Sequence, residues 1–202
     1  MDLFLFDDTY RQKGYPVIAG VDEAGRGPWA GPVVAAAVIL PEGLVIEGVN
    51  DSKKLTPAKR ENLYEIITKQ ALSYGVGIVD NIAIDEMNIL KATHKAMNIA
   101  LSGLKSAYDI VLVDGNPVPS LPGRQEAIVK GDGKSASIAS ASIIAKVTRD
   151  RIMDDISAVY PNFGFSRHKG YGTKEHLEAL KKFGPCPLHR RSFRPIKDMV
   201  AL

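Results

Sequence analysis

Four carboxylate side chains stand in or directly after short apolar runs of this chain: Asp22 and Glu23 in VIAGVDEAGRG, Asp114 in IVLVDGN and Asp132 in AIVKGDGKS. Apolar runs of this length predict strands of a buried sheet. Carboxylates that gather at one edge of a sheet repel one another unless a proton or a cation lies between them. Hard divalent cations such as Mg²⁺ prefer oxygen ligands, so the pattern favours a divalent-metal site.

Phosphoryl transfer is the chemistry that such a site performs. Two ions about 3.5–4 Å apart can activate a water and stabilise the leaving oxygen of an in-line displacement. Any one of these acids could instead be a turn residue or a cap, but four together are harder to explain in that way. Adjacent strand residues face opposite sides, so Asp22 and Glu23 share a site only if the strand ends or bends there. Gly25 and Gly27 would supply that freedom.

Several other residues are suited to bind a polyanion near these acids. The motif Gly25-Arg26-Gly27 lets backbone N–H groups approach a substrate, although a tight hairpin link with a solvated arginine explains it equally simply. Ser142, Lys146 and Arg149 share one helix face and could line a phosphate track or form a solvated stripe. Tyr171, between two glycines, could stack on a sugar or a base, or be an ordinary loop tyrosine.

The whole chain has the size and composition of one folded domain. Its 202 residues are 45% hydrophobic, and the single cysteine, Cys186, excludes an internal disulfide. The acidic N-terminus and the short apolar runs predict neither a signal peptide nor a membrane span, so we expect a cytoplasmic protein. Without heptads or a long exposed apolar stripe, a monomer is the default expectation. The net charge is only +3, but six basic residues gather near the C-terminus: Lys181, Lys182, Arg190, Arg191, Arg194 and Lys197.

Strands and helices are expected to alternate after an initial hairpin. The predicted strands are 17–21, 33–40, 74–79, 110–113 and 127–129, and the predicted helices are 57–72, 89–104, 136–156 and 173–183. This order implies an α/β fold with a mixed sheet flanked by helices. We expect a single catalytic domain over 1–202, with 158–202 as a helical, basic C-terminal extension packed on it. None of the four histidines shows metal-ligand spacing, and none is assigned chemistry.

Five segments, taken in order, closely resemble bacterial ribonuclease HII: GVDEAGRGPWAGPVVAAAVIL, NDSKKLT, VDGN, the block from KGD to ASIIAKVTRDR, and FSRHKGYGTKEH. The resemblance covers about residues 15–194. It implies a ribonuclease H-like fold and cleavage of the RNA strand of RNA/DNA hybrids and of single ribonucleotides embedded in duplex DNA. The related type HIII has an added N-terminal domain and a different glycine motif, so type HII is preferred.

The resemblance also implies roles for individual residues. Asp22, Glu23, Asp114 and Asp132 would be catalytic and coordinate two Mg²⁺ or Mn²⁺ ions, and we expect Asp114 to be the shared ligand. Gly25, Arg26 and Gly27 would sense the ribonucleotide 2′-OH, since glycine lets the backbone reach it. Tyr171 would stack on the following deoxyribose. The expected substrate-binding set is completed by Lys53, Ser142 and Lys146. No obligate protein partner is expected.

Two other readings remain open at this point. A DNA exonuclease or a strand transferase on the same fold would share the carboxylates but would not need the motif Gly25-Arg26-Gly27. A nonenzymatic nucleic-acid-binding protein would explain the basic tail and Tyr171. Clustered carboxylates repel phosphate in the absence of metal, however, so they would be a handicap to a protein that only binds.

Overall fold

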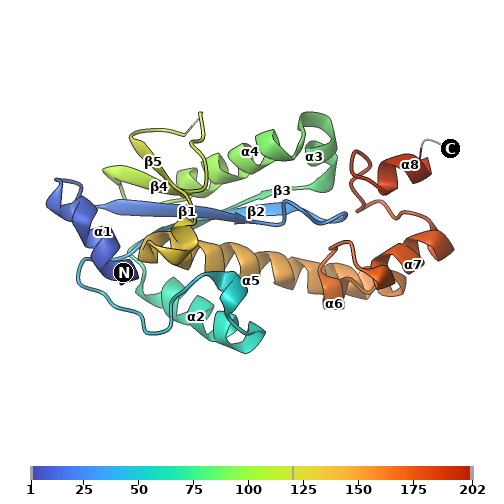
Figure 1. Ribbon diagram of the computed structural model, residues 1–202, viewed down its shortest axis with the longest axis horizontal. Coiled ribbons are helices and arrows are strands. Elements are labelled where there is room, and N and C mark those ends of the chain that lie inside the picture. Colours follow the sequence, from blue (N-terminus) through green and yellow to red (C-terminus); the bar gives the residue numbers. More distant parts are fainter. Residues whose placement is uncertain (1, 120, 201–202) are drawn as a thin grey trace.

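A five-stranded mixed sheet forms the centre of the molecule, in a computed structural model that describes residues 2–119 and 121–200. The strands lie in the order β3-β2-β1-β4-β5 (Figure 1) and are β1 (Ile18–Ala24), β2 (Val33–Ile39), β3 (Ser73–Val79), β4 (Ile110–Asp114) and β5 (Gln125–Ile128). The pairs β1–β2 and β2–β3 are antiparallel, and β1–β4 and β4–β5 are parallel. The predicted α/β fold is confirmed.

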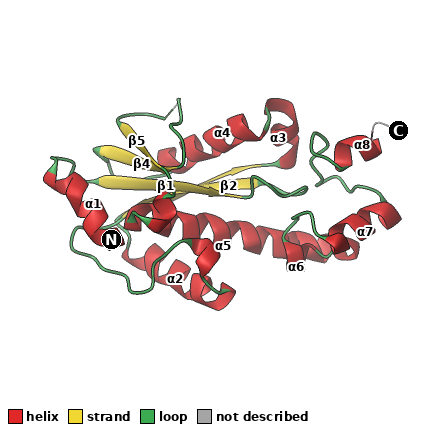
Figure 2. Cartoon of the chain, viewed as in Figure 1, coloured by secondary structure: helices red, strands yellow, loops and turns green. Residues whose placement is uncertain are grey.

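Helices cover both faces of the sheet (Figure 2). One face packs against α4 (Ile89–Ser102) and the short α3 (Asn81–Met87), and the other against α5 (Ala136–Val159), with α2 (Pro57–Gln70) beyond it. Glycines allow close contact on both sides: a Cβ on Gly77 would lie 1.9 Å from the carbonyl oxygen of Ala96, and one on Gly20 would lie 2.2 Å from the backbone of Ser137. The central helix α5 therefore lies directly on β1, the strand that carries two of the acids.

The predicted helix ranges agree closely with the observed helices, and capping residues explain where these begin. Thr56 and Ser135 cap α2 and α5 by accepting hydrogen bonds from backbone N–H groups three residues on. Thr173 does the same for α7 (Lys174–Phe183), which Gly184 ends at φ 71°. The prediction for β1 was wrong at its end: the strand continues through both acids to Ala24, because β2 pairs with it as far as Val34.

The C-terminal elements gather at one end of the sheet. After α5 come a 3₁₀ turn (Pro161–Phe163), α6 (Phe165–His168), α7 and α8 (Ile196–Val200), with an apolar cluster of their own around Phe165 and Leu180 (Figure 1). At the other end, α1 (Leu3–Gln12) was not predicted; Asp7 ties it to the start of α5 by accepting from Ser137. Within 2–119 and 121–200, no helix is long and apolar enough to cross a membrane. The division of the chain at residue 158 stays a prediction.

Candidate active site

The chain brings three of the predicted acids together where β1 and β4 separate. The last β1–β4 pair is Val21–Val113, so Asp22 and Asp114 follow directly. Asp132 lies on a 3₁₀ turn (Gly131–Gly133) after β5, and the N–H of Gly131 donates to Asp114 Oδ1 over 2.6 Å. One carboxylate oxygen from each of Asp22, Asp114 and Asp132 lies within 4.8 Å of the other two. Residues 110 positions apart therefore form one acidic cluster.

Burial and mutual repulsion make this cluster costly while it is charged. Burial raises the pKa of Asp22 well above its usual value, and the charges of Glu23 and Asp114 raise it further. The pKa of Asp114 is raised by burial and then by Asp132. Both effects disfavour the ionised form, and a bound cation would remove the repulsion. The donor set, carboxylate oxygens only, fits a hard divalent cation such as Mg²⁺ or Mn²⁺.

Glu23 lines the same cavity but is not a member of the three-oxygen cluster. Burial raises its pKa, while Arg26, which donates to Glu23 Oε1 over 3.2 Å, lowers it. Although β1 does not end at Asp22, it has lost its β4 neighbour there. The open position beside β1, and not a bend, lets adjacent strand residues reach one cavity.

A cavity of about 250 Å³ is lined by nearly all the site residues that the sequence predicted. Lys53 sits at its rim on a 3₁₀ turn (Ser52–Lys54) and donates to Asp132 over 3.2 Å. The lining comprises Asp22, Glu23, Ala24, Gly25, Arg26, Gly27, Ser52, Lys53, Asp114, Ser142, Lys146 and Tyr171. The predicted substrate-binding residues therefore surround the acids.

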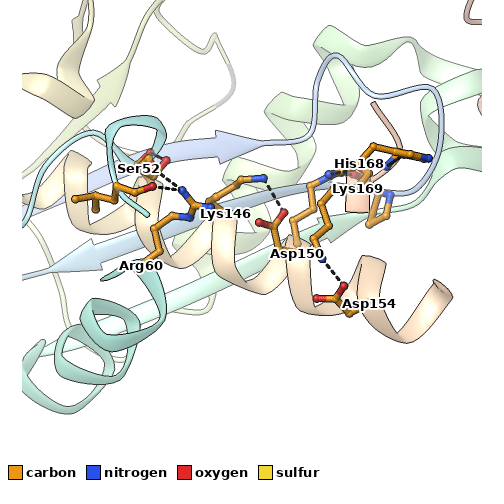
Figure 3. A network of polar contacts seen from close by, with 12 residues as sticks. Ser52, Arg60, Lys146, Asp150, Asp154, His168 and Lys169 are labelled. Carbon is orange, nitrogen blue, oxygen red and sulfur yellow. Dashed lines mark hydrogen bonds and ion pairs between the residues drawn. The ribbon is translucent and has the colours of Figure 1, made fainter. Parts of the chain in front are cut away.

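The polar residues of α5 differ in how available they are to a substrate. Ser142 is buried, and its hydroxyl lies 2.9 Å from that of Ser52. Lys146 is half-buried and donates to Asp150 over 2.7 Å (Figure 3). Burial lowers the pKa of Lys146, partly offset by Asp150. Of the two, only Lys146 presents a charge at the cavity wall.

A second, larger cavity of about 490 Å³ adjoins the first and shares Lys146 and Tyr171 with it. Figure 3 shows two lysine–aspartate pairs in its lining, Lys146 with Asp150 and Lys169 with Asp154. Arg60 also lines it and donates to the carbonyl of Ser52 over 2.9 Å. The larger cavity is therefore lined by basic side chains, three of which are paired with the acids Glu61, Asp150 and Asp154.

The two glycines of the Gly25-Arg26-Gly27 motif serve different purposes. A Cβ on Gly25, at φ 96°, would lie 2.1 Å from the guanidinium of Arg149. The close packing of the Arg149 side chain against this backbone therefore requires glycine. A Cβ on Gly27 would meet only the ring of Tyr171, at 3.8 Å. Gly27 thus leaves open space beside the exposed Tyr171 ring, where the backbone faces the cavity.

Arg149 does not belong to a phosphate track, and that expectation was wrong. It is fully buried and donates to the carbonyls of Pro32, Ala30 and Lys169. Helical spacing put it on the face of Ser142 and Lys146, but the β1–β2 link covers that part of α5, so the side chain lies under the link and not in solvent.

Arg190, which the sequence placed only in a basic tail, is buried beside Arg149. It donates to the carbonyls of Gly25, Arg26, Gly31 and Pro32. Burial, and then the charge of Arg149, lower the pKa of Arg190 to about 9, so it stays charged at neutral pH. No local pattern distinguishes Arg190 from its basic neighbours; only the fold brings the β1–β2 link onto it.

The comparisons with known proteins agree on one family. The sequence profile of the family described as Ribonuclease HII matches residues 19–196. Ribonuclease HII of Acetivibrio thermocellus is 56% identical over 193 residues, which is 96% of this chain and 75% of that one. Ribonuclease HII of Caldicellulosiruptor bescii is 55% identical over 199 residues, covering 98% and 96%. The crystal structure of ribonuclease H2 from Pyrococcus horikoshii OT3 superposes with a TM-score of 0.78 at 31% identity, covering 91% and 96%.

A mixed five-stranded sheet with carboxylates at the point where β1 and β4 separate, together with these similarities, defines a ribonuclease H-like enzyme. Within that class, the chain belongs to the ribonuclease HII family and is a ribonuclease.

Proposed function

We propose that this ribonuclease hydrolyses the RNA strand of RNA/DNA hybrids and nicks duplex DNA on the 5′ side of a single embedded ribonucleotide, leaving a 3′-hydroxyl and a 5′-phosphate. The observation that carries the proposal is the cluster of Asp22, Asp114 and Asp132 beside the Gly25-Arg26-Gly27 motif. The first feature suits phosphodiester hydrolysis, and the second suits recognition of a ribose.

Asp22, Asp114 and Asp132 would hold divalent cations, with Glu23 completing the set. Two Mg²⁺ or Mn²⁺ ions would supply an activated water and neutralise the charge that develops on the phosphate. We propose Asp114 as the shared ligand because its charge interacts with those of both Asp22 and Asp132. Its Oδ1 is oriented by the N–H of Gly131, which fixes the carboxylate before any ligand arrives.

The remaining cavity residues would orient the nucleic acid. Gly27 would let the backbone contact a 2′-OH, and Arg26, half-exposed beside Glu23, would contact a phosphate. Lys53 and Lys146 both carry charge into the lining of the cavity, and Tyr171 offers a ring on which a sugar can stack. The larger cavity beyond Tyr171 would hold the continuing nucleic-acid strand.

The test uses a DNA duplex with one ribonucleotide, incubated with and without Mg²⁺ or Mn²⁺, beside an all-DNA duplex. We expect metal-dependent nicking 5′ of the ribonucleotide alone. Nicking of all-DNA duplex would instead indicate a general nuclease, and metal-independent binding without cleavage would indicate a binding protein. Comparing Gly27→Ala with wild type separates ribose recognition from chemistry: the variant should lose preference for the ribonucleotide while it still binds metal.

Metal binding itself can be tested without a substrate. A ligand that binds only the folded state at about 100 times its Kd stabilises that state by about 2.7 kcal/mol. Thermal unfolding should therefore shift upward with Mg²⁺ or Mn²⁺, and the shift should be lost in Asp114→Asn. The cytoplasmic location and the monomeric state inferred from the sequence remain predictions.

A further inference from the structure

Three of the four histidines meet in the C-terminal part of the molecule, close to Tyr171. His168 of α6, His176 of α7 and His189 are buried, and the rings of His168 and His176 stack with their centroids 4.5 Å apart. Nε2 of His176 lies 2.9 Å from Nε2 of His189. Trp29, the only tryptophan, packs 5.2 Å from His176. The cluster thus joins the β1–β2 link to the C-terminal helices.

The contacts of these rings determine where each proton lies. His176 Nδ1 is 2.9 Å from the carbonyl of Tyr171, which can only accept, so this nitrogen carries the proton. Nε2 of the neutral ring then accepts, and His189 must donate from its own Nε2. His189 Nδ1 is left to accept from the N–H of Cys186, at 2.9 Å, so it does not donate to the Cys186 carbonyl, which lies farther away at 3.2 Å. Burial lowers the pKa of His176 and of His189 to about 4, consistent with two neutral rings.

Two of these rings hydrogen-bond to the backbone around Tyr171. The N–H of Gly170 donates to His168 Nδ1 over 3.2 Å, and the carbonyl of Gly170 accepts from Trp29 over 2.8 Å. The N–H of Tyr171 donates to the carbonyl of His168, and its own carbonyl accepts from His176 Nδ1 and from the N–H of Thr173, each over 2.9 Å. Because glycines flank Tyr171 on both sides, the local chain has little stiffness of its own. The His176 ring supplies part of this stiffness, beside the backbone hydrogen bonds from Trp29 and Thr173.

The ring that this backbone carries lies at the edge of the catalytic cavity. It is 42% exposed, and Lys146 Nζ lies 5.9 Å from its centroid. A small rotation of the Tyr171 backbone would move the ring away from the space beside Gly27, because the side chain extends several ångströms from its Cα.

We propose that His176, oriented by His189, is a positioning residue that fixes Tyr171 for substrate binding through its Nδ1–H contact with the Tyr171 carbonyl. The inference rests on the proposed function, in which the Tyr171 ring stacks on a sugar. A histidine that only filled the core could be replaced by an apolar residue of similar size. A positioning residue needs a donor and an acceptor at fixed places.

A double-mutant cycle tests this role. His176→Leu should raise the Kd and KM for a ribonucleotide-containing duplex about tenfold, the size of one lost stacking contact, with less change in kcat. His176→Gln, which keeps a donor and an acceptor, should recover most of the loss. In a Tyr171→Ala background, His176→Leu should change binding less than twofold. Equal losses in both backgrounds, or no recovery with Gln, would overturn the proposal.

Two further measurements guard against a folding artefact and against failure of the enzymatic proposal. Leu180→Val shortens a buried side chain of the same helix away from Tyr171 and should leave Kd unchanged, as matched control. In the full-length protein, long-range ¹H–¹⁵N NMR at neutral pH should show Nδ1–H for His176 and Nε2–H for His189; the opposite tautomers would refute the contact. Duplex binding needs no cleavage, so a protein that binds with this coupling but does not nick would refute only the proposed function.

Discussion

The catalytic cavity holds acids that face one another, whereas the support beneath it holds two arginines that face backbone carbonyls. Besides burial, the charge of Asp114 raises the pKa of Asp22, and the charge of Asp132 raises that of Asp114. Hydrogen bonds to each carboxylate, and Lys53 near Asp114, offset this only in part. Arg149 and Arg190 instead donate to carbonyls of the β1–β2 link and of Lys169. Carboxylates that repel one another favour a bound cation. Guanidinium groups that are hydrogen-bonded to carbonyls hold the backbone in place.

The largest expected effect comes from breaking the first region. Asp114→Asn keeps the shape of the side chain but removes a proposed cation ligand that supplies several kcal/mol to the transition state. Single-turnover nicking should fall about a thousandfold. Metal-free thermal stability should not fall, because one repulsive charge is gone. Asp155→Asn, an exposed acid on α5, is the control, and activity within tenfold of wild type in Asp114→Asn would contradict the assignment.

Removing one of the two buried arginines should lower the stability of the fold, whereas Asp114→Asn should lower activity. Arg190→Met leaves the carbonyls of Gly25, Arg26, Gly31 and Pro32 without this donor in a buried place. We expect a loss of about 3 kcal/mol in the free energy of unfolding, measured with urea. Arg191→Met, an exposed neighbour, should cost little. A similar cost for both substitutions would show that the buried guanidinium is not a scaffold.

The acids and the histidines should give metal-free stability opposite pH dependences. The pKa of Asp22 is raised from 3.8, so its contribution is present at low pH and is lost as pH rises through the raised value. The pKa of His176 is lowered from 6.5 to about 4, so stability is lost as pH falls below about 6.5. In urea unfolding with chelator, Asp22→Asn should reduce the first slope and His176→Gln the second, while Asp114 and His189 keep part of each. Unchanged slopes in either variant would contradict its assignment.

The smallest expected effect is at the rim of the cavity. Lys53 is 75% exposed and paired with Asp132, and exposed pairs contribute about 0–1 kcal/mol. Lys53→Gln should raise KM about threefold and reduce the salt dependence of duplex binding by about one counterion, since a phosphate contact is lost. The same change at the neighbouring Lys54 is the control. Equal effects at both positions would mean that Lys53 has no specific contact with the substrate.

Local signals were sufficient for much of the fold. The predicted ranges matched α2, α4 and α7 closely, and apolar runs marked β1, β2 and β4. They failed at α1, whose place depends on the long-range contact between Asp7 and the start of α5. They also failed at the end of β1, because the length of a strand depends on how far its partner continues.

By itself, the sequence indicated the residues of the candidate site: the acids at the strand ends, the glycines beside them, and the family that the chain resembles. Residue type and local spacing carry that information. Only the tertiary structure decided that Arg149 and Arg190 lie beneath the link and that three histidines meet beside Tyr171. A buried polar group is defined by its partners, and these partners lie as many as 165 residues away along the chain.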